Sequence, residues 1–170
     1  ISAITYARNH NIPFLGICFG MQMAVIEFAR NKLNIKKATS SEFGPSKASV
    51  VGLMSEWVKN GKKVKGTDKD LGGTMRLGSY EAKLKKGSLI SKIYNSIKID
   101  ERHRHRYEVN INFKDEFEKK GMIFSGLSPN LKLPEIIELK NHPWFVGVQF
   151  HPEFKSRPLA PHPLFSSFIK

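Results

Sequence analysis

The chain has 170 residues, and its 40% of hydrophobic residues is typical of one globular domain with a packed core, which excludes a disordered chain. No run approaches the roughly 18 apolar residues of a membrane span, no signal peptide pattern opens the sequence, and a single cysteine excludes an internal disulfide, so we expect a cytoplasmic protein with no membrane partner. The formal net charge of +13 raises the question of a nucleic-acid partner, which depends on where the lysines lie.

The first predicted elements are a helix, a strand and a second helix. Residues 1–10 (ISAITYARNH) place Ile1, Ile4 and Ala7 on one helical face, residues 11–17 (NIPFLGI) form a buried strand, and residues 18–33 form a helix that is apolar on almost every side. This order predicts an α/β fold with a mostly parallel central sheet flanked by helices. Because an α/β domain usually opens with a strand, we expect its N-terminal part to lie outside this chain.

The middle of the chain is predicted to be rich in loops between residues 43 and 70. Within it, residues 59–70 (KNGKKVKGTDKD) are lysine-rich, as are residues 83–87 (KLKKG). No RNA-binding signature accompanies these lysines, so we interpret both segments as solvated loops and expect no nucleic-acid partner. A basic nucleic-acid module is kept as a minor alternative, for which salt-dependent binding to DNA or RNA would be the evidence.

The rest of the chain alternates predicted strands and short helices. A helix, or a transition from helix to strand, is predicted at 88–97, a second helix at 113–121 with Gly121 after its last turn, and a third at the end of the Pro-rich tail. Strands are predicted within residues 72–84, 101–110, 122–128, 134–140 and 144–150, the third and fourth of them as a hairpin.

Cys18 lies in a local pattern that predicts a nucleophile. Gly16-Ile17-Cys18-Phe19-Gly20 has the G-x-nucleophile-x-G form of a nucleophile elbow. Small neighbours let the backbone turn tightly between strand and helix, and the side chain then lies at the carboxyl edge of the sheet. We expect the helix N-terminus to lower the pKa of the thiol and the N–H of Phe19 to bind an oxyanion. The alternative is a cysteine buried in the core.

His151 and Glu153 are the predicted partners of this cysteine. A cysteine nucleophile needs a base, and the base needs a group that orients it. His151 follows the apolar strand at 144–150, Pro152 keeps it out of the helical region, and Glu153 comes two residues later. One ring nitrogen then faces Cys18, and the other donates to Glu153, which fixes the tautomer.

The other histidines fit the role of base less well. We expect His10 and His142 to be exposed, and His162 lies in the Pro-rich tail. His103 and His105 alternate with three arginines, and neither a second cysteine nor a close carboxylate pair accompanies them, so we expect no metal site there.

Two strings place these residues in a known context. GICFGMQ and QFHPEF resemble the cysteine elbow and the H-P-E string of the class I (triad) glutamine amidotransferases. GICFGMQMAVIEFARN, SSEF, GGTMRLG, ERHRHRYEVN and FVGVQFHPEFKSRP resemble the glutaminase domains of the CTP synthase branch of that family, from residue 16 to 158. The resemblance implies that residues 1–170 form a glutaminase domain truncated at its N-terminus, with the family's oxyanion loop upstream of Ile1 and the amidoligase (synthase) domain absent from this chain.

The same resemblance implies a reaction and a set of residues. Cys18 would attack the side-chain amide of L-glutamine, His151 would move the proton from the thiol to the departing ammonia, and Glu153 would orient His151. The implied glutamine-binding residues are Phe19 and Gly20 at the elbow, Gln22, Glu42, Arg106 for the α-carboxylate, and Tyr107. Arg76 is expected to be structural or near a domain interface, and the basic residues at 102–105 to lie at the surface, at an interface or against a nucleotide effector.

In that branch the ammonia passes to the synthase domain of the same polypeptide. There ATP and Mg convert UTP to CTP, GTP activates the glutaminase step, and the enzymes form homotetramers; the resemblance implies neither a metal nor a cofactor within residues 1–170. The alternatives are another triad amidotransferase, a γ-glutamyl hydrolase, or an inactive amidotransferase-like binding module. The first two leave GGTMRLG and ERHRHRYEVN unexplained, and intact Cys18, His151 and Glu153 argue against the last.

Overall fold

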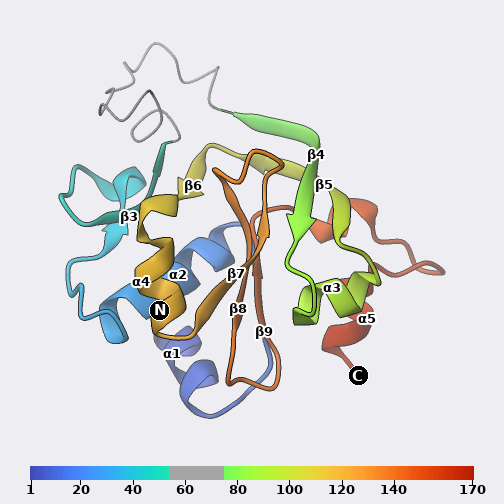
Figure 1. Cartoon of the computed structure of the whole chain (residues 1–170), viewed down its shortest axis with the longest axis horizontal. Helices are drawn as coiled ribbons and strands as arrows, with labels where there is room; N and C mark the ends of the chain where they lie inside the picture. The colour runs from blue at the N-terminus through green and yellow to red at the C-terminus, as the bar shows by residue number, and fades with distance from the viewer. Residues whose placement is uncertain (54–74) are drawn as a thin grey trace.

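A computed structural model describes residues 1–53 and 75–170, which form a six-stranded sheet, a smaller three-stranded sheet and the helices that cover them (Figure 1). The strand order is β1-β9-β8-β7-β4-β5 in the large sheet and β2-β3-β6 in the small one. The strands are β1 (Phe14–Ile17), β2 (Thr39–Ser40), β3 (Ser49–Leu53), β4 (Arg76–Leu84), β5 (Lys98–His105), β6 (Tyr107–Val109), β7 (Met122–Leu127), β8 (Pro134–Leu139) and β9 (Phe145–Val148). The α-helices are α1 (Ser2–Asn9), α2 (Phe19–Asn31), α3 (Leu89–Tyr94), α4 (Lys114–Lys119) and α5 (Pro163–Phe168), with 3-10 turns η1 (Ser41–Phe43), η4 (Ile111–Phe113) and η5 (Pro152–Lys155).

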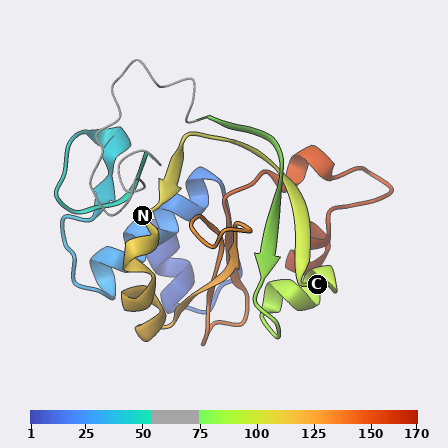
Figure 2. The same ribbon diagram turned by 45° about the horizontal axis from the view of Figure 1, so that its top comes forward.

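The large sheet separates two apolar cores. Helices α1, α2 and α4 lie on one side of it, and α3 and α5 lie on the other (Figures 1 and 2). Successive side chains of a strand point to opposite faces, so Ile137 and Phe145 join the core under α2 and α4, whereas Ile136 and Val146 join the core under α3 and α5. In the described ranges no helix combines the length and apolar character needed to cross a bilayer.

The α/β class is as predicted, but the sheet is mixed rather than mostly parallel. Among the described strands of the large sheet, β1 and β9 pair parallel, and the other neighbouring pairs are antiparallel. Residues 128–133 join β7 to β8, and residues 140–144 join β8 to β9. A parallel crossover needs about a dozen residues or more, so connections this short require the antiparallel arrangement.

The structure confirms the opening helix, strand and helix, the β7–β8 hairpin and the three short helices α3, α4 and α5. Gly121 follows the last turn of α4, as predicted, with a φ of +99°. Residues 44–48 form neither helix nor strand, as predicted, but residues 49–53 differ from the prediction, because they form β3, which pairs with both β2 and β6. The single strand predicted at 101–110 is divided into β5 and β6, which belong to different sheets. The loop predicted at 59–70 and the first residues of the segment 72–84 lie outside the described residues.

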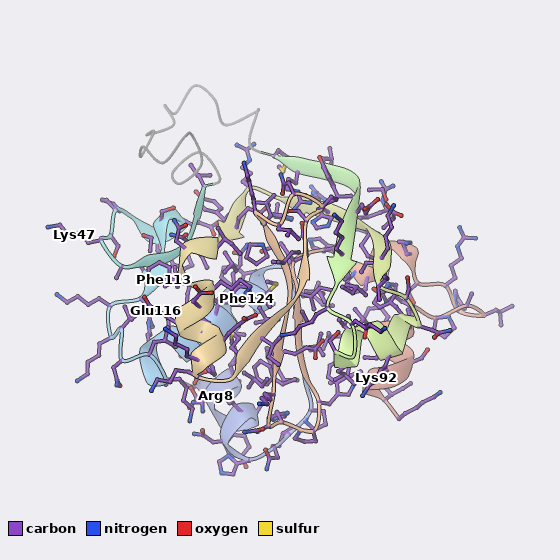
Figure 3. The ribbon with its side chains drawn as sticks, viewed as in Figure 1. Arg8, Lys47, Lys92, Phe113, Glu116 and Phe124 are labelled. Atoms are coloured by element: carbon purple, nitrogen blue, oxygen red, sulfur yellow. The ribbon has the colours of Figure 1, made fainter. Side chains whose placement is uncertain are left out.

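Most of the described lysines are exposed to solvent. Lys83, Lys85 and Lys86 at the end of β4 are exposed, as predicted for this edge. Lys47 and Lys92 likewise project outward from two sides of the molecule (Figure 3).

Gly16 allows α2 to start directly against strand β1. A Cβ at this position would lie 2.8 Å from the carbonyl carbon of Gly20 and 2.9 Å from the backbone nitrogen of Met21, whereas a Cβ at Gly20 would meet nothing within 4 Å. We therefore expect Gly16→Ala to lower the free energy of unfolding by about 1–3 kcal/mol, because α2 must move away from the sheet. Gly20→Ala is the control, and urea denaturation should find it no less stable than wild type. Equal stability of the two variants would contradict this account.

Candidate active site

Cys18 occupies a strained turn between β1 and α2. Its φ of 49° and ψ of −101° are disfavoured for a residue with a side chain. The N–H of Cys18 donates to the carbonyl of Val148 at 2.7 Å, and the N–H of Gln22 donates to the carbonyl of Cys18 at 3.2 Å. Strand β9 and helix α2 thus hold the predicted turn from both sides. The thiol is half-buried and belongs to neither apolar core.

The environment of the thiol differs from the expectation in one respect. Burial raises the pKa of Cys18, and the carboxylates of Glu108 and Glu153 raise it further. The N–H of Phe19 and the amide of Gln149 act in the opposite direction but are outweighed. The N–H of Phe19 at the helix N-terminus therefore lowers the pKa, as predicted. Desolvation of the thiolate is the larger effect, so the pKa of Cys18 is raised and not lowered as expected.

His151 and Glu153 form a close pair just beyond β9. His151 Nδ1 lies 2.6 Å from Glu153 Oε1, and the imidazole stacks on Phe154 with ring centroids 5.1 Å apart. The segment does not stay extended as predicted, since Glu153 lies in the 3-10 turn η5, but this turn still brings the two side chains together. The N–H of His151 donates to the carbonyl of Arg102 at 2.8 Å, which anchors the histidine to β5.

Cys18 and His151 lie at the same edge of the large sheet. Ile17 of β1 is opposite Val148 of the parallel strand β9, so both chains leave the sheet side by side in the same direction. Among the described residues no hydrogen bond joins the thiol to the imidazole. Catalytic hydrogen bonds are often long before substrate binds, so this geometry is compatible with proton transfer.

The predicted glutamine-binding residues fall into two groups, one around Phe19 and Glu42 and the other where α2 meets β6. Phe19 is 50% exposed and makes an edge-to-face contact with Phe43, the neighbour of the exposed Glu42, at 6.2 Å between ring centroids. Gln22 is buried, and its Nε2 donates to the carbonyl of Tyr107 at 2.9 Å. Arg106, where β5 gives way to β6, is half-buried. In the described part of the chain the side chains of Glu42 and Arg106 make no hydrogen bond or ion pair.

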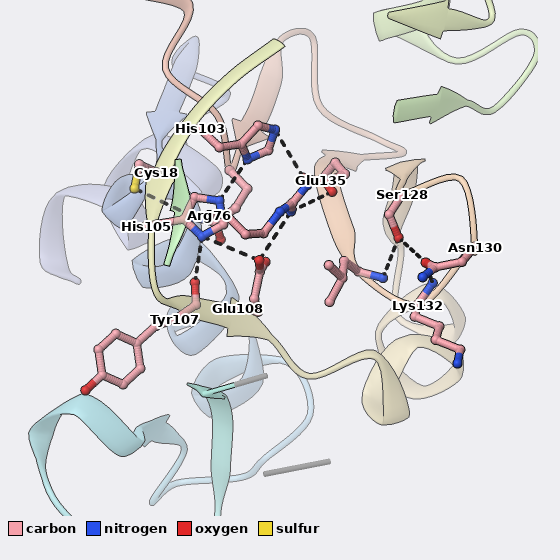
Figure 4. A network of polar contacts seen from close by, with 12 residues as sticks. Cys18, Arg76, His103, His105, Tyr107, Glu108, Ser128, Asn130, Lys132 and Glu135 are labelled. Atoms are coloured by element: carbon pink, nitrogen blue, oxygen red, sulfur yellow. Dashed lines mark hydrogen bonds and ion pairs between the residues drawn. The ribbon is translucent and has the colours of Figure 1, made fainter. Parts of the chain in front are cut away.

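Sequence reasoning missed a buried ionic network beside the site. Arg76 Nη1 lies 2.8 Å from Glu135 Oε1 and 3.2 Å from Glu108 Oε1, so one guanidinium links β4, β6 and β8 (Figure 4). His103 Nδ1 and His105 Nε2 are 2.8 Å apart in the same network. Arg76 is structural, as expected, but the two histidines are buried and not at the surface. The signal available in the sequence was the period of two in KIDERHRH (98–105), which places Ile99, Glu101, His103 and His105 on one face of a strand.

Burial controls the protonation of this network. It raises the pKa of Glu108 to about 8 and that of Glu135 to about 7, although the charge of Arg76 lowers both. Burial and Arg76 together lower the pKa of His103 to about 2 and that of His105 to about 3. Both imidazoles are therefore neutral at physiological pH, and the two carboxyl groups retain a proton between them.

This network predicts a stability that falls as the pH rises from 6.5 to 8. The folded carboxyls hold protons that the unfolded chain releases above pH 4.5, so their contribution is lost through that window. The histidines act oppositely, but only below pH 6.5, where the unfolded chain takes up protons. We expect a loss of about 1–2 kcal/mol between pH 6.5 and 8 in urea denaturation, and a smaller loss in Glu108→Gln. An identical pH dependence in that variant would refute the assignment.

In residues 1–53 and 75–170, no three His, Cys, Asp or Glu side chains gather closely enough to hold a metal ion.

Comparison with known proteins places the whole chain in one family model, Glutamine amidotransferase class-I, matched over residues 1–170. The chain is 78% identical to a CTP synthase of Pelagibacter ubique over 170 residues, which is all of this chain and 32% of that protein. It is 62% identical to a CTP synthase of Hyphomonas neptunium over 96% of this chain and 30% of that protein. The chain thus spans about a third of the length of these relatives.

The fold also matches solved structures. The glutaminase domain of Trypanosoma brucei CTPS, with bound acivicin, superposes with a TM-score of 0.84 and 36% identity over 98% of this chain and 62% of that one. A glutamine amidotransferase from Thermotoga maritima superposes with a TM-score of 0.51 and 16% identity over 89% of this chain and 45% of that one, which is evidence for the fold alone.

Proposed function

Because the chain belongs to the class-I glutamine amidotransferase family, we propose that it hydrolyses L-glutamine to glutamate and ammonia at Cys18. The observation that carries the proposal is a shared position at one edge of the sheet. A strained cysteine follows β1, and the His151–Glu153 pair follows the neighbouring parallel strand β9. A nucleophile, a base and a group that orients the base are the three parts that thiol catalysis requires.

The steps follow from the position of each group. His151 takes the proton of the Cys18 thiol, and the thiolate attacks the side-chain carbonyl carbon of glutamine. Glu153 holds the Nδ1 proton of His151, so the other ring nitrogen is the one that exchanges protons. The N–H of Phe19 donates to the oxyanion, His151 protonates the leaving ammonia, and water then releases glutamate from the γ-glutamyl thioester.

We assign the remaining glutamine contacts by charge and exposure. Glu42 is exposed near Phe19 and suits the α-ammonium group, whereas Arg106 suits the α-carboxylate, for which its guanidinium offers two parallel donors. Gly20 leaves open space at the start of α2, and Tyr107 on β6 is assigned to the border of the bound glutamine. Gln22 completes the set from α2, where its amide nitrogen is already bonded to Tyr107.

For the whole protein we propose a CTP synthase. Residues 1–170 would be its glutaminase domain, without the N-terminal part of that domain, and the synthase domain of the same polypeptide would use the ammonia. The identity to CTP synthases three times the length of this chain supports this division. We further propose that the synthase domain uses ATP, Mg and UTP and that GTP activates the glutaminase step. The full-length protein would be a cytoplasmic homotetramer.

The glutaminase step is tested by trapping its covalent intermediate. The full-length protein is mixed with isotopically labelled glutamine and quenched in acid, and the peptide that contains Cys18 is examined by mass spectrometry. We expect a γ-glutamyl group on Cys18 and release of labelled glutamate. His151→Ala should slow both by about 10²-fold or more. Glutamate release without label on Cys18, or no release at all, would overturn the proposal.

A further inference from the structure

Gln149 is a buried polar residue that lies against the thiol and that neither the motif nor the triad includes. Its side chain is fully buried at the end of β9, and its Nε2 donates to Cys18 Sγ at 3.6 Å. Its backbone N–H donates to the carbonyl of Glu135 at 2.8 Å, which ties this end of β9 to the neighbouring strand β8. This amide is therefore placed where it can act on the charge of the reacting sulfur.

The direction of this amide is fixed by a chain of hydrogen bonds that begins at a backbone carbonyl. The carbonyl of Tyr107 only accepts, so the group of Gln22 that faces it at 2.9 Å must be the NH2. The same NH2 group lies 3.3 Å from the Gln149 side chain, and only an oxygen there accepts its second hydrogen. The Gln149 nitrogen is then the atom left to face Cys18. The reverse orientation would oppose two NH2 groups and turn an oxygen toward the sulfur.

We infer that Gln149 is a catalytic residue that donates a hydrogen bond to the Cys18 thiolate and stabilises it until the sulfur attacks glutamine. The inference rests on the proposed glutaminase function. When His151 takes the thiol proton, the sulfur gains a full negative charge, and a hydrogen bond to a charged acceptor is about twice as strong as one to a neutral acceptor. On thioester formation that charge is lost, so the bond is strongest in the state that reacts.

The charges around Cys18 make such a donor necessary. The thiol faces Glu108 from β6 and Glu153 from η5, both of which oppose a thiolate, as does burial. The N–H of Phe19 from α2 favours the thiolate. His151 lies at the same sheet edge, while the neutral His103 and His105 lie in the network that Arg76 joins to Glu108. Gln149 supplies a second donor without adding a charge.

The experiment measures the pH dependence of Cys18 alkylation in the full-length protein. Iodoacetamide is used as the probe, and the Cys18 peptide is quantified by mass spectrometry, so other cysteines do not interfere. The midpoint is the pH at which the alkylation rate of Cys18 reaches half its maximum. In Gln149→Met this midpoint should rise by about one pH unit or more, because the thiolate loses one hydrogen-bond donor. In Gln149→Glu it should rise further, because a carboxylate replaces the donor. The kcat/KM for glutamine should fall about 10- to 100-fold in Gln149→Met.

Two further variants separate this role from a structural one. Gln22→Met should raise the midpoint by less than Gln149→Met, since it frees the Gln149 amide to turn. Ser125→Ala is the control, because Ser125 is buried on β7 and its hydroxyl has no hydrogen-bond partner in the described residues. Its midpoint should equal that of wild type.

A wild-type midpoint in Gln149→Met or in Gln149→Glu overturns the inference, and the second variant serves if the first does not fold. Failure of this inference can be distinguished from failure of the proposed function. A shifted midpoint in a protein that does not hydrolyse glutamine would remove the glutaminase proposal and leave the hydrogen bond to the thiolate. Hydrolysis of glutamine with unshifted midpoints would keep the glutaminase proposal and remove the proposed role of Gln149.

Discussion

Replacement of Cys18 by alanine should lower CTP formation from UTP, ATP and glutamine by at least about 10⁴-fold, while CTP still forms when ammonium is supplied instead. The first loss is expected because Cys18 is the single cysteine of the chain and supplies the sulfur that attacks glutamine. The second activity is expected because ammonium bypasses glutamine hydrolysis. The measurement compares the wild-type full-length protein with Cys18→Ala, each with both nitrogen sources.

The same experiment contains the outcomes that would contradict it. If Cys18→Ala used glutamine as well as wild type does, Cys18 would be a structural residue and the triad assignment would be wrong. If the variant failed with ammonium as well, the hydrolytic and synthetic reactions would not be separable in the way proposed. Cys18→Ser is a matched variant that keeps the size and a hydrogen-bonding atom, and it should fail with glutamine in the same way.

Replacement of Arg76 by methionine should lower the free energy of unfolding by about 3–5 kcal/mol. Arg76 is 7% exposed, and its guanidinium lies between the buried carboxyls of Glu108 and Glu135, so its removal leaves negative charge buried without a partner. The loss should be larger at pH 8 than at pH 6, because the carboxyls accept protons at the lower pH. Urea denaturation at the two pH values measures both effects.

Arg104→Met is the matched control for this prediction. Arg104 lies on the neighbouring strand β5 but is exposed, so its replacement should change stability by no more than about 0.5 kcal/mol. A triple variant that also carries Glu108→Gln and Glu135→Gln should recover part of the loss, because it removes the unpaired charge. Equal stability of Arg76→Met and wild type would show that the network does not need its cation.

The local parts of the site were predictable from the sequence. A tight turn after a short apolar strand is encoded by the few residues around Cys18, and His151 and Glu153 are separated by one proline. The opening helix, strand and helix follow from apolar periodicity over short windows in the same way. In each case the interacting residues are close in sequence, so the pattern contains the contact.

The parts that were missed depend on pairing between distant segments. Arg76 meets Glu108 and Glu135 only because β4, β6 and β8 lie side by side, and no pattern around Arg76 names those partners. Strand β3 was assigned to a loop because its partner β6 follows more than fifty residues later. Gln149 was counted as part of an apolar strand. A polar residue inside an apolar run, two positions before a predicted catalytic histidine, was the signal available for it.

The backbone conformation of Cys18 has a consequence for how the protein could evolve. A glycine adopts a φ of 49° without the strain that a side chain adds there, and strain of this kind costs on the order of 1–3 kcal/mol. A drifting copy of the gene, released from selection for glutamine hydrolysis, would therefore gain stability by losing its nucleophile first. Selection for folding and selection for catalysis disagree at this one position, and the cysteine persists only while the second prevails.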